Sequence, residues 1–454
     1  MQPIAASVVI RKTGTSQARR EMCPIGCNIM KYEYSKGYEI VRFFERITLS
    51  LHYRKIVYKG TENINEDHPV IFASNHRNAV IDPFLLLNAC KKEPVFLARA
   101  DIFRKPVVAG IMKWLHIMPV YRIRDGVESL GNNNESFRSG GELLKKRIPM
   151  ALYPEGKHNP KMSLLPVQKA ISRIVLPIEA SEGFTLNSEV IPVGVHYPDI
   201  FEFLSDAYVV FGKPIKVADY QKQYEENPNL AANRLRRDLE KRMQELIVNI
   251  WNDEFYDEYV WAIDWNAPRS AKDHLSASQD VVRALDEMYQ QDRASFDIHI
   301  ENFRNANRML KKYRLSSKDN VVQPASTASI IWQLLPLIIS LPVSVFGFAN
   351  GILPILGYRK LLGVFKDNQF IPTVRVVSGL FIVPLFVLIQ SLAMGFIFNW
   401  QWAAVYFFLM PATFYFACWW RKWAKSLVRK WRINRFVKKF PDKWEKLTGL
   451  IKTE

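Results

Sequence analysis

Two long stretches of this sequence contain no charged side chain, and they constrain the fold more than any other feature. Residues 320–358 and 376–420 include no Lys, Arg, Asp or Glu. A helix needs about 20 apolar residues to cross a hydrocarbon core of about 30 Å. The second stretch is long enough for two such helices joined by a turn near residues 399–401, so we expect a hairpin of two membrane spans at 376–420. Tryptophans lie at its bends and its end, where an aromatic belt would place them: Trp400, Trp402, Trp419 and Trp420.

The first charge-free stretch is interrupted by prolines and glycines, among them Pro342, Gly347 and Gly351. We expect a re-entrant or single-span element at 328–358. Both flanks of the hairpin are basic, which favours the cytosolic side for its two ends. If the remaining domain is cytosolic as well, the stretch must enter and leave on the same side, which favours the re-entrant form.

The net charge of +18 is unevenly distributed over the 454 residues. Residues 421–454 carry twelve Lys and Arg against three Asp and Glu, which is half of the total excess. A basic surplus suits nucleic acid or anionic lipid equally, but its position beside the apolar stretches favours an anionic lipid surface. We therefore expect membrane lipids and no nucleic acid as partners. Cys23 and Cys27 lack a second Cys/His pair at zinc spacing, so no metal site is expected.

Apolar runs alternate with helical patterns through the middle of the chain, which predicts an α/β domain with a central, mostly parallel sheet flanked by helices. Ligands of such sheets bind beyond the carboxyl ends of the strands. The expected strands are 69–73, 94–98, 117–121, 149–153, 189–195 and 207–212, and the expected helices are 83–91, 105–115, 134–147, 167–177 and 231–251.

Residues 37–57 have the pattern of an amphipathic helix, with apolar side chains at helical spacing and basic ones between them. Two interpretations stay open, a surface helix packed on the domain and an interfacial helix lying on an anionic membrane. The expected parts of the chain are a disordered leader (1–36), an amphipathic membrane-interface helix (37–60), the α/β domain (61–251), a charged and solvated helical insert (252–320), the membrane region (321–420) and a basic cytosolic tail (421–454).

The run from Val70 to Ala73 reads as a buried strand, and it ends in Ser74, Asn75 and His76. Asp82 follows, and the next residue, a proline, is typical of a first helical turn. A neutral imidazole can take a proton from a hydroxyl near pH 7, and a carboxylate can orient the ring and stabilise the imidazolium. The two residues can meet only if the chain between them turns. The pair is a candidate acid/base site.

Three further stretches end expected strands in chemically useful residues. MPVYR (118–122) leads to Arg122, whose guanidinium suits a phosphate. YPEG (153–156) ends in a turn in which Glu155 could bond a hydroxyl and Gly156 allows close backbone approach. VIPVG (190–194) is an apolar strand containing Pro192. Taken singly, these residues could be a salt-bridge partner, a turn residue and an edge-strand marker.

Taken together and in this order, NHRNAVID (75–82), MPVYR, YPEG and VIPVG resemble the four blocks of the glycerolipid acyltransferases that make lysophosphatidate and phosphatidate. Five residues separate His76 from Asp82, whereas four are commoner in that family. The five-residue spacing and the Leu-Leu-Pro at 164–166 resemble the fungal branch that uses glycerol-3-phosphate and dihydroxyacetone phosphate. That branch also has C-terminal membrane segments.

The resemblance implies that His76 is the general base and Asp82 its orienting partner, with Asn75, Arg122, Glu155 and Gly156 binding the acceptor. It implies no cofactor and no metal, with acyl-CoA or acyl-carrier protein as co-substrate. The expected function is that of a membrane-bound O-acyltransferase of phospholipid biosynthesis, its catalytic domain on the cytoplasmic side, acting on glycerol-3-phosphate. The alternatives are acyl transfer to 1-acylglycerol-3-phosphate and a non-catalytic lipid-binding protein with the same fold.

Overall fold

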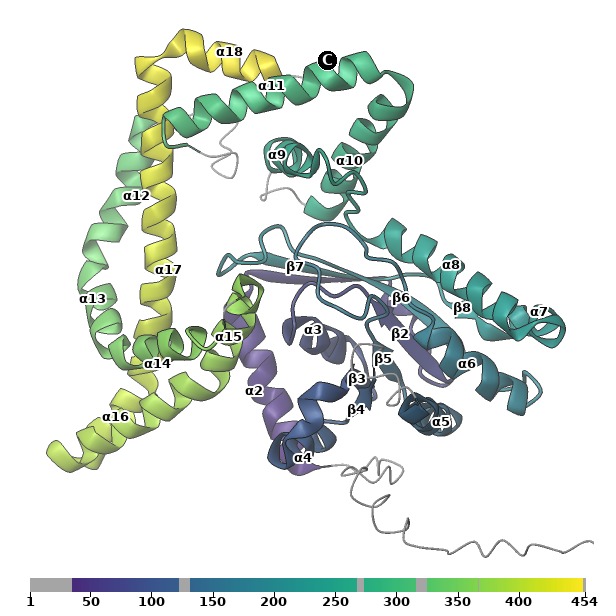
Figure 1. The fold of residues 1–454 in the computed structure, drawn as a ribbon. Coiled ribbons are helices and arrows are strands. Elements are labelled where there is room, and N and C mark those ends of the chain that lie inside the picture. The colour runs from purple at the N-terminus through teal and green to yellow at the C-terminus, as the bar shows by residue number, and fades with distance from the viewer. Residues whose placement is uncertain (1–34, 122–130, 268–272, 316–324, 366, 452–454) are drawn as a thin grey trace, which may run out of the picture.

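A mixed β-sheet forms the centre of the α/β domain (Figure 1). The computed structural model describes residues 35–121, 131–267, 273–315, 325–365 and 367–451. Within these residues the sheet has eight strands in the order β1-β7-β6-β2-β5-β3-β4, with β8 beside β6. They are β1 (Lys55–Lys59), β2 (Val70–Ser74), β3 (Val95–Arg99), β4 (Ile117–Val120), β5 (Met150–Leu152), β6 (Glu189–His196), β7 (Asp206–Phe211) and β8 (Ile215–Lys216).

The predicted mostly parallel sheet is confirmed. Five neighbouring pairs run parallel, and among the described strands only the pairs β6–β7 and β6–β8 are antiparallel. Pro192 lies in β6, which has neighbouring strands on both sides, so this proline does not mark an edge strand. Its position falls between the residues of β6 that pair with β8 and those that pair with β7, so the N–H that proline lacks is not needed there.

Helices cover both faces of the sheet, which follows from the alternation of side chains along buried strands. In β2, Ile71 and Ala73 pack with α5 (Gly131–Lys145), α6 (Ala170–Ser181) and α8 (Pro228–Leu246). Val70 and Phe72 point the other way, against α2 (Lys36–His52) and α3 (Ile81–Ala89). The sheet edge near β4 also carries α4 (Pro106–Trp114), and α7 (Gln221–Glu226) precedes α8.

The predicted amphipathic helix is real, but the prediction that it extends over 37–57 is wrong, because α2 ends at His52 and Lys55–Lys59 is an edge strand. Its apolar stripe faces outward and is exposed, with Phe43 and Phe44 at 60% and 50% accessibility. The buried side instead contains Arg42, whose guanidinium donates to the carbonyls of Leu87 and Cys90 at 3.1 and 3.0 Å. Of the two open interpretations, this orientation favours the interfacial helix.

The helices after the sheet form a packed subdomain, so the expectation of a solvated spacer at 252–320 is wrong. They are α9 (Tyr256–Asn266), α10 (His274–Gln291) and α11 (Arg293–Lys312). Phe296 and Phe303 of α11 are buried in a core that also includes Leu447 of α18 (Pro441–Ile451). The C-terminal tail is therefore part of this core rather than a separate extension.

The apolar C-terminal region is helical throughout its described length. It contains α12 (Thr327–Ile339), α13 (Leu341–Asn350), α14 (Ile352–Leu362), α15 (Ile371–Val377), α16 (Val383–Ile397) and α17 (Trp400–Lys439). Among the described residues, Asn368–Ile397 and Trp400–Lys439 are long and apolar enough to cross a membrane. A third span results if α12 and α13, which are bent by 52° at their junction, are counted as one.

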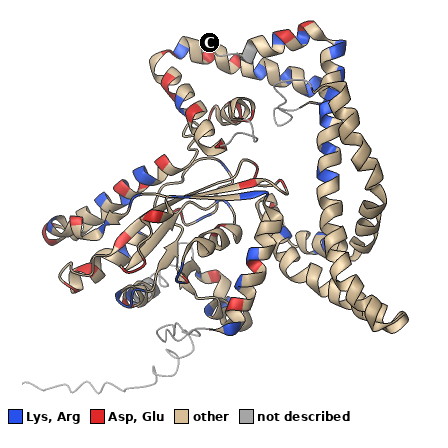
Figure 2. Cartoon of the chain, turned by 180° about the vertical axis from the view of Figure 1, so that it is seen from behind, with Lys and Arg blue, Asp and Glu red and all other residues tan. Residues whose placement is uncertain are grey.

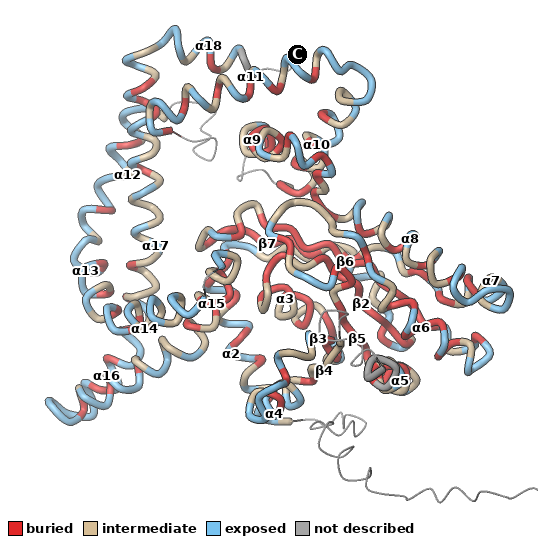
Figure 3. Tube along the Cα trace, in the orientation of Figure 1, coloured by how far each residue is buried: buried red, intermediate tan, exposed pale blue. Residues whose placement is uncertain are grey.

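The change in charge falls at the expected boundary near residue 420, but the helices do not divide there. Helix α17 continues without a break through that position. Figure 2 shows its first half and the neighbouring helices almost free of charge, whereas lysines and arginines line its second half. The side chains of α12, α13 and α16 are largely exposed (Figure 3), as expected for helices that face lipid rather than water.

Candidate active site

Three adjacent strands bring the candidate site together. β2 lies between β5 and β6 and runs parallel to both, so their carboxyl ends meet at one edge of the sheet. His76 follows β2, Tyr153 and Glu155 follow β5, and Tyr197 follows β6. The sheet topology therefore explains why residues 120 positions apart in the sequence contact one another.

Asp82 is a fully buried carboxylate that accepts four hydrogen bonds. Its Oδ2 accepts from the main-chain N–H groups of Arg77 and Asn78 at 2.8 and 2.7 Å, and it lies 2.9 Å from Nδ1 of His76. Its Oδ1 accepts the hydroxyl of Tyr197 at 2.5 Å. The loop before α3 therefore wraps around this carboxylate, which is how five intervening residues allow His76 and Asp82 to meet.

The partners of Asp82 determine which nitrogen of His76 carries the proton. Because an ionised carboxylate can only accept, Nδ1 must donate to it, which leaves Nε2 as the acceptor in the neutral ring. The His76 side chain keeps 13% of its surface accessible while that of Asp82 has none. This arrangement can remove a proton from a hydroxyl at Nε2 and stabilise the resulting imidazolium through Asp82.

Two aromatic rings contact the imidazole of His76. The Tyr153 ring is stacked on it with centroids 3.8 Å apart and planes 15° apart, and the His158 ring lies at 4.1 Å. Burial, together with the nearby His76, lowers the pKa of His158 to about 4. His158 is therefore neutral at pH 7 and does not oppose the formation of a positive charge on its neighbour.

Glu155 holds the backbone of the catalytic loop. Its Oε1 accepts the main-chain N–H of His76 at 2.8 Å, and its Oε2 accepts that of Leu165 at 2.9 Å. Burial raises the pKa of Glu155 to about 7 in spite of these two bonds, which lower it. The carbonyl of His76 accepts the N–H of Asn159 at 2.8 Å, so both main-chain groups of His76 are fixed by the loop after β5.

These contacts differ from the substrate-binding roles expected for Glu155, Asn75 and Gly156. The side-chain amide of Asn75 donates to the Val195 carbonyl at 3.0 Å and accepts the Val195 N–H at 2.7 Å, which continues the β2–β6 pairing rather than pointing to an acceptor. Gly156 has a φ of +70°, and a Cβ there would meet no described atom within 4 Å. The turn conformation by itself therefore favours a glycine at this position, and the space beside it is open. Arg122 lies outside the described residues.

Several residues at this edge had no predicted role. Tyr197 could have been found, because it directly follows the strand beside β2. Thr373 of α15 could not have been found from spacing. Its hydroxyl donates to Oδ1 of Asn78 at 2.6 Å and accepts the N–H of Val80 at 3.3 Å. Phe370, just before α15, packs edge-on against His158 at 6.0 Å.

Comparisons with known proteins agree with this geometry. The family model described as Acyltransferase matches residues 55–196, from the start of β1 to the end of β6. The chain is 30% identical over 105 residues to glycerol-3-phosphate O-acyltransferase 2 of Saccharomyces cerevisiae, a match that covers 23% of this chain and 14% of the yeast protein.

Among solved structures, the 1-acyl-sn-glycerophosphate (LPA) acyltransferase PlsC of Thermotoga maritima is similar at 20% identity. That match covers 45% of this chain and 78% of the other, with a TM-score of 0.31. The expected family resemblance is confirmed, while the assignment to the branch with five residues between His and Asp stays a prediction. The α/β domain of this chain is therefore similar to the glycerolipid acyltransferases.

Proposed function

We propose that this chain is a membrane-bound O-acyltransferase of phospholipid biosynthesis that transfers an acyl group from acyl-CoA or acyl-carrier protein to glycerol-3-phosphate. One observation carries the proposal: the ring of His76 is fixed by Asp82 through Nδ1, while Nε2 is left to act on an acceptor hydroxyl. The family of the domain supports acyl transfer as the reaction class.

The proposed reaction follows from this geometry. Nε2 of His76 takes the proton of the acceptor hydroxyl as its oxygen attacks the thioester carbonyl, so that a carbon–oxygen bond forms. The carbon–sulfur bond then breaks, and the thiolate leaves with the proton returned by the imidazolium. Asp82 stabilises the positive ring between the two proton transfers. General-base catalysis of this kind contributes about 10²–10⁴-fold.

The other expected residues take different parts in the proposal. Glu155 and Asn75 are positioning residues, because they bond the main chain of the catalytic loop and of β6. Arg122, beyond the end of β4, is proposed to bind the acceptor phosphate. Neither a cofactor nor a metal takes part in the proposed steps.

One observation favours glycerol-3-phosphate as the acceptor. The relative with 30% identity is named for glycerol-3-phosphate, but the chain spans only 14% of that protein's length. The alternative acceptor is 1-acylglycerol-3-phosphate. A third possibility, lipid binding without turnover, would leave the His76–Asp82 pair without a use.

Purified full-length protein incubated with labelled acyl-CoA tests the proposal, with each acceptor supplied in turn and thiol release measured. We expect an acylated product with glycerol-3-phosphate that exceeds the product with 1-acylglycerol-3-phosphate, and none with the His76→Ala protein. Preference for the second acceptor would change the substrate and keep the reaction. Absence of thiol release with both acceptors would refute the enzyme.

The proposed orientation places the catalytic domain, both ends of the hairpin and the basic second half of α17 on the cytoplasmic side. It is supported by the lysines and arginines at both ends of the hairpin, such as Arg375 and Arg421. Protease protection of tagged protein in sealed vesicles tests it. Opposite accessibility of tags at residues 310 and 440 would exclude it.

A further inference from the structure

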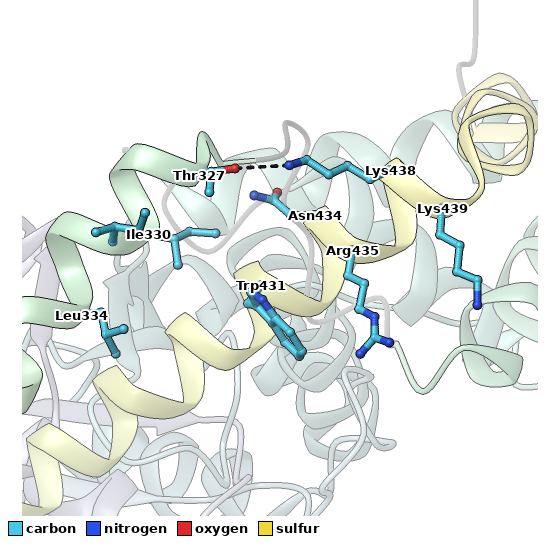
Figure 4. A pocket seen from close by; sticks show the side chains of 9 residues that line it. Thr327, Ile330, Leu334, Trp431, Asn434, Arg435, Lys438 and Lys439 are labelled. Carbon is cyan, nitrogen blue, oxygen red and sulfur yellow. Dashed lines mark hydrogen bonds between the residues drawn. The ribbon is translucent and has the colours of Figure 1, made fainter.

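An open groove lies between α12 and the second half of α17, and none of its lining residues belongs to the candidate active site. One part has a volume of about 370 Å³ and the adjoining part about 580 Å³, and Ile330, Leu334 and Trp431 line both. The two parts therefore form one continuous depression, whose outer part is shown in Figure 4.

The first part of the groove is apolar. Its walls include Leu337 and Ile338 of α12 and Trp420 and Leu427 of α17. From Trp420 to Trp431 it follows α17 for about 16 Å at 1.5 Å per residue. This length is about half of a hydrocarbon core of about 30 Å. The groove begins where the charge-free half of α17 ends, so it is continuous with the surface that faces lipid.

The second part of the groove is basic. Arg435, Lys438 and Lys439 line it together with Asn434 and Thr327, and no carboxylate is among the described residues that do so (Figure 4). The Arg435 guanidinium lies 5.5 Å from the centre of the Trp431 ring, and the ammonium of Lys438 donates to the Thr327 hydroxyl at 3.4 Å. Three cations at the end of an apolar channel are suited to a phosphate attached to a hydrocarbon chain.

Asn434 provides an independent indication of a ligand. It is 92% buried, since its exposed fraction is 8%, and its Nδ2 donates to the Ala325 carbonyl, which fixes the orientation of the amide. Its Oδ1 is buried and has no hydrogen-bond partner among the described residues. Because an unpaired buried acceptor costs free energy, the site lacks a donor that a ligand can supply.

We propose that the α12–α17 groove is a binding site for one anionic glycerophospholipid, with an acyl chain along the apolar part and the phosphate among Arg435, Lys438 and Lys439. A headgroup N–H or O–H donates to Oδ1 of Asn434. A free phosphate would leave the apolar part empty, and a zwitterionic lipid without a donor, such as phosphatidylcholine, would bring a quaternary ammonium beside the cations and leave Oδ1 of Asn434 unpaired. The bound lipid holds the two helices together at the membrane–water boundary.

The experiment uses purified full-length protein in detergent and measures the thermal unfolding midpoint during titration with phosphatidylserine, phosphatidylcholine or inorganic phosphate. The test protein carries Arg435→Gln and Lys438→Gln. The matched control carries Lys425→Gln and Arg432→Gln, two exposed cations of the same helix that lie outside the groove. Both proteins lose two positive charges, so only the location of the charges differs.

We expect phosphatidylserine to raise the midpoint of the wild-type and control proteins, and the apparent affinity of the test protein to fall by about 30-fold, as two membrane-surface cations would contribute. Ala424→Trp, which places a large ring in the apolar part, should weaken the same response without any change of charge. Equal affinities of the test and control proteins would overturn the proposal. So would an equal response to phosphatidylcholine or to inorganic phosphate.

Discussion

The loop after β2 and the loop after β5 meet at the same edge of the sheet, and each places a buried carboxylate against His76. In the first loop Asp82 bonds the imidazole itself. In the second loop Glu155 bonds the main-chain N–H of the same residue. The two carboxylates are alike in chemistry and burial, yet one can respond to the charge on the ring and the other can only fix the position of the backbone.

This difference shows that the partner of a residue decides its role more than its type does. Residues 75–82 supply the reacting groups, whereas residues 153–159 supply a stacked ring, a neutral histidine and two hydrogen bonds to the main chain of His76. Substitutions in the two loops should therefore separate into losses of chemistry and losses of position.

The largest effect is expected for the two histidines that touch each other. His76→Ala removes the proposed base and should lower kcat by about 10²–10⁴-fold, whereas His158→Ala removes only a neighbouring ring and should cost much less. Acyl transfer by both purified proteins, with their thermal midpoints as a check on folding, measures the contrast. Equal losses would mean that the two loops share the chemistry.

Asp82→Asn should have the next largest effect, a loss in kcat of up to about 10⁴-fold, which is what the wrong histidine tautomer costs in a Ser-His-Asp triad. The new amide places a donor among four groups that donate, and it favours the wrong tautomer of His76. Tyr197→Phe is the matched control, since it removes one of the four donors and leaves the carboxylate. If the two variants lost the same activity, the hydrogen-bond network rather than the charge of Asp82 would be the important feature.

Glu155→Gln should lower activity by about 10- to 150-fold, because one of its two bonds to main-chain N–H groups is lost, at about 1.5–3 kcal/mol. As a positioning residue it should leave the pH profile of kcat in its wild-type form. An altered pH profile would assign Glu155 a role in proton transfer and would remove the distinction between the loops.

The carboxyl of Glu155 should make the stability of the wild-type protein depend on pH. Burial raises the pKa of Glu155 from 4.5 to about 7, so the folded protein binds this proton more tightly than the unfolded chain does. The resulting stabilisation is fully present below about pH 4.5 and is lost as the pH rises through about 7. Wild-type protein should therefore lose stability relative to Glu155→Gln over this range, which thermal unfolding at several pH values measures.

Much of the α/β domain could be predicted because the physical signals were local. The run from Val70 to Ala73 predicted a buried strand, and the pair His76 and Asp82 stood at its end. The role of Asn75 could not be predicted, since its amide bonds Val195, 120 positions away. Strand β1 was also missed, because the basic and apolar residues of Lys55–Lys59 were read as a continuation of the amphipathic pattern of the preceding helix.

The helical regions were predicted less well for the same reason. A charged composition at 252–320 indicated a solvated spacer, but the core there is formed with Leu447 and other residues of α18, which no local pattern reveals. The change of composition near residue 420 indicated a boundary, yet α17 continues through it, because lysine, arginine and apolar side chains all suit a helix, and even Pro411 lies inside it. Contacts between distant segments are what the sequence did not contain.

Thr373 makes one of the contacts between the apolar C-terminal region and the α/β domain, and its substitution should have the smallest effect. Thr373→Val removes the hydrogen bonds to Asn78 and Val80 in the first loop and leaves the second loop untouched. The shorter of these two bonds, to Asn78, is a neutral bond of about 1 kcal/mol, so kcat should fall by at least about fivefold. Thr373→Ser keeps the hydroxyl and should keep the activity. If valine and serine behaved alike, the membrane helix would support the first loop by packing alone, and its position would depend on Asp82 and Glu155 only.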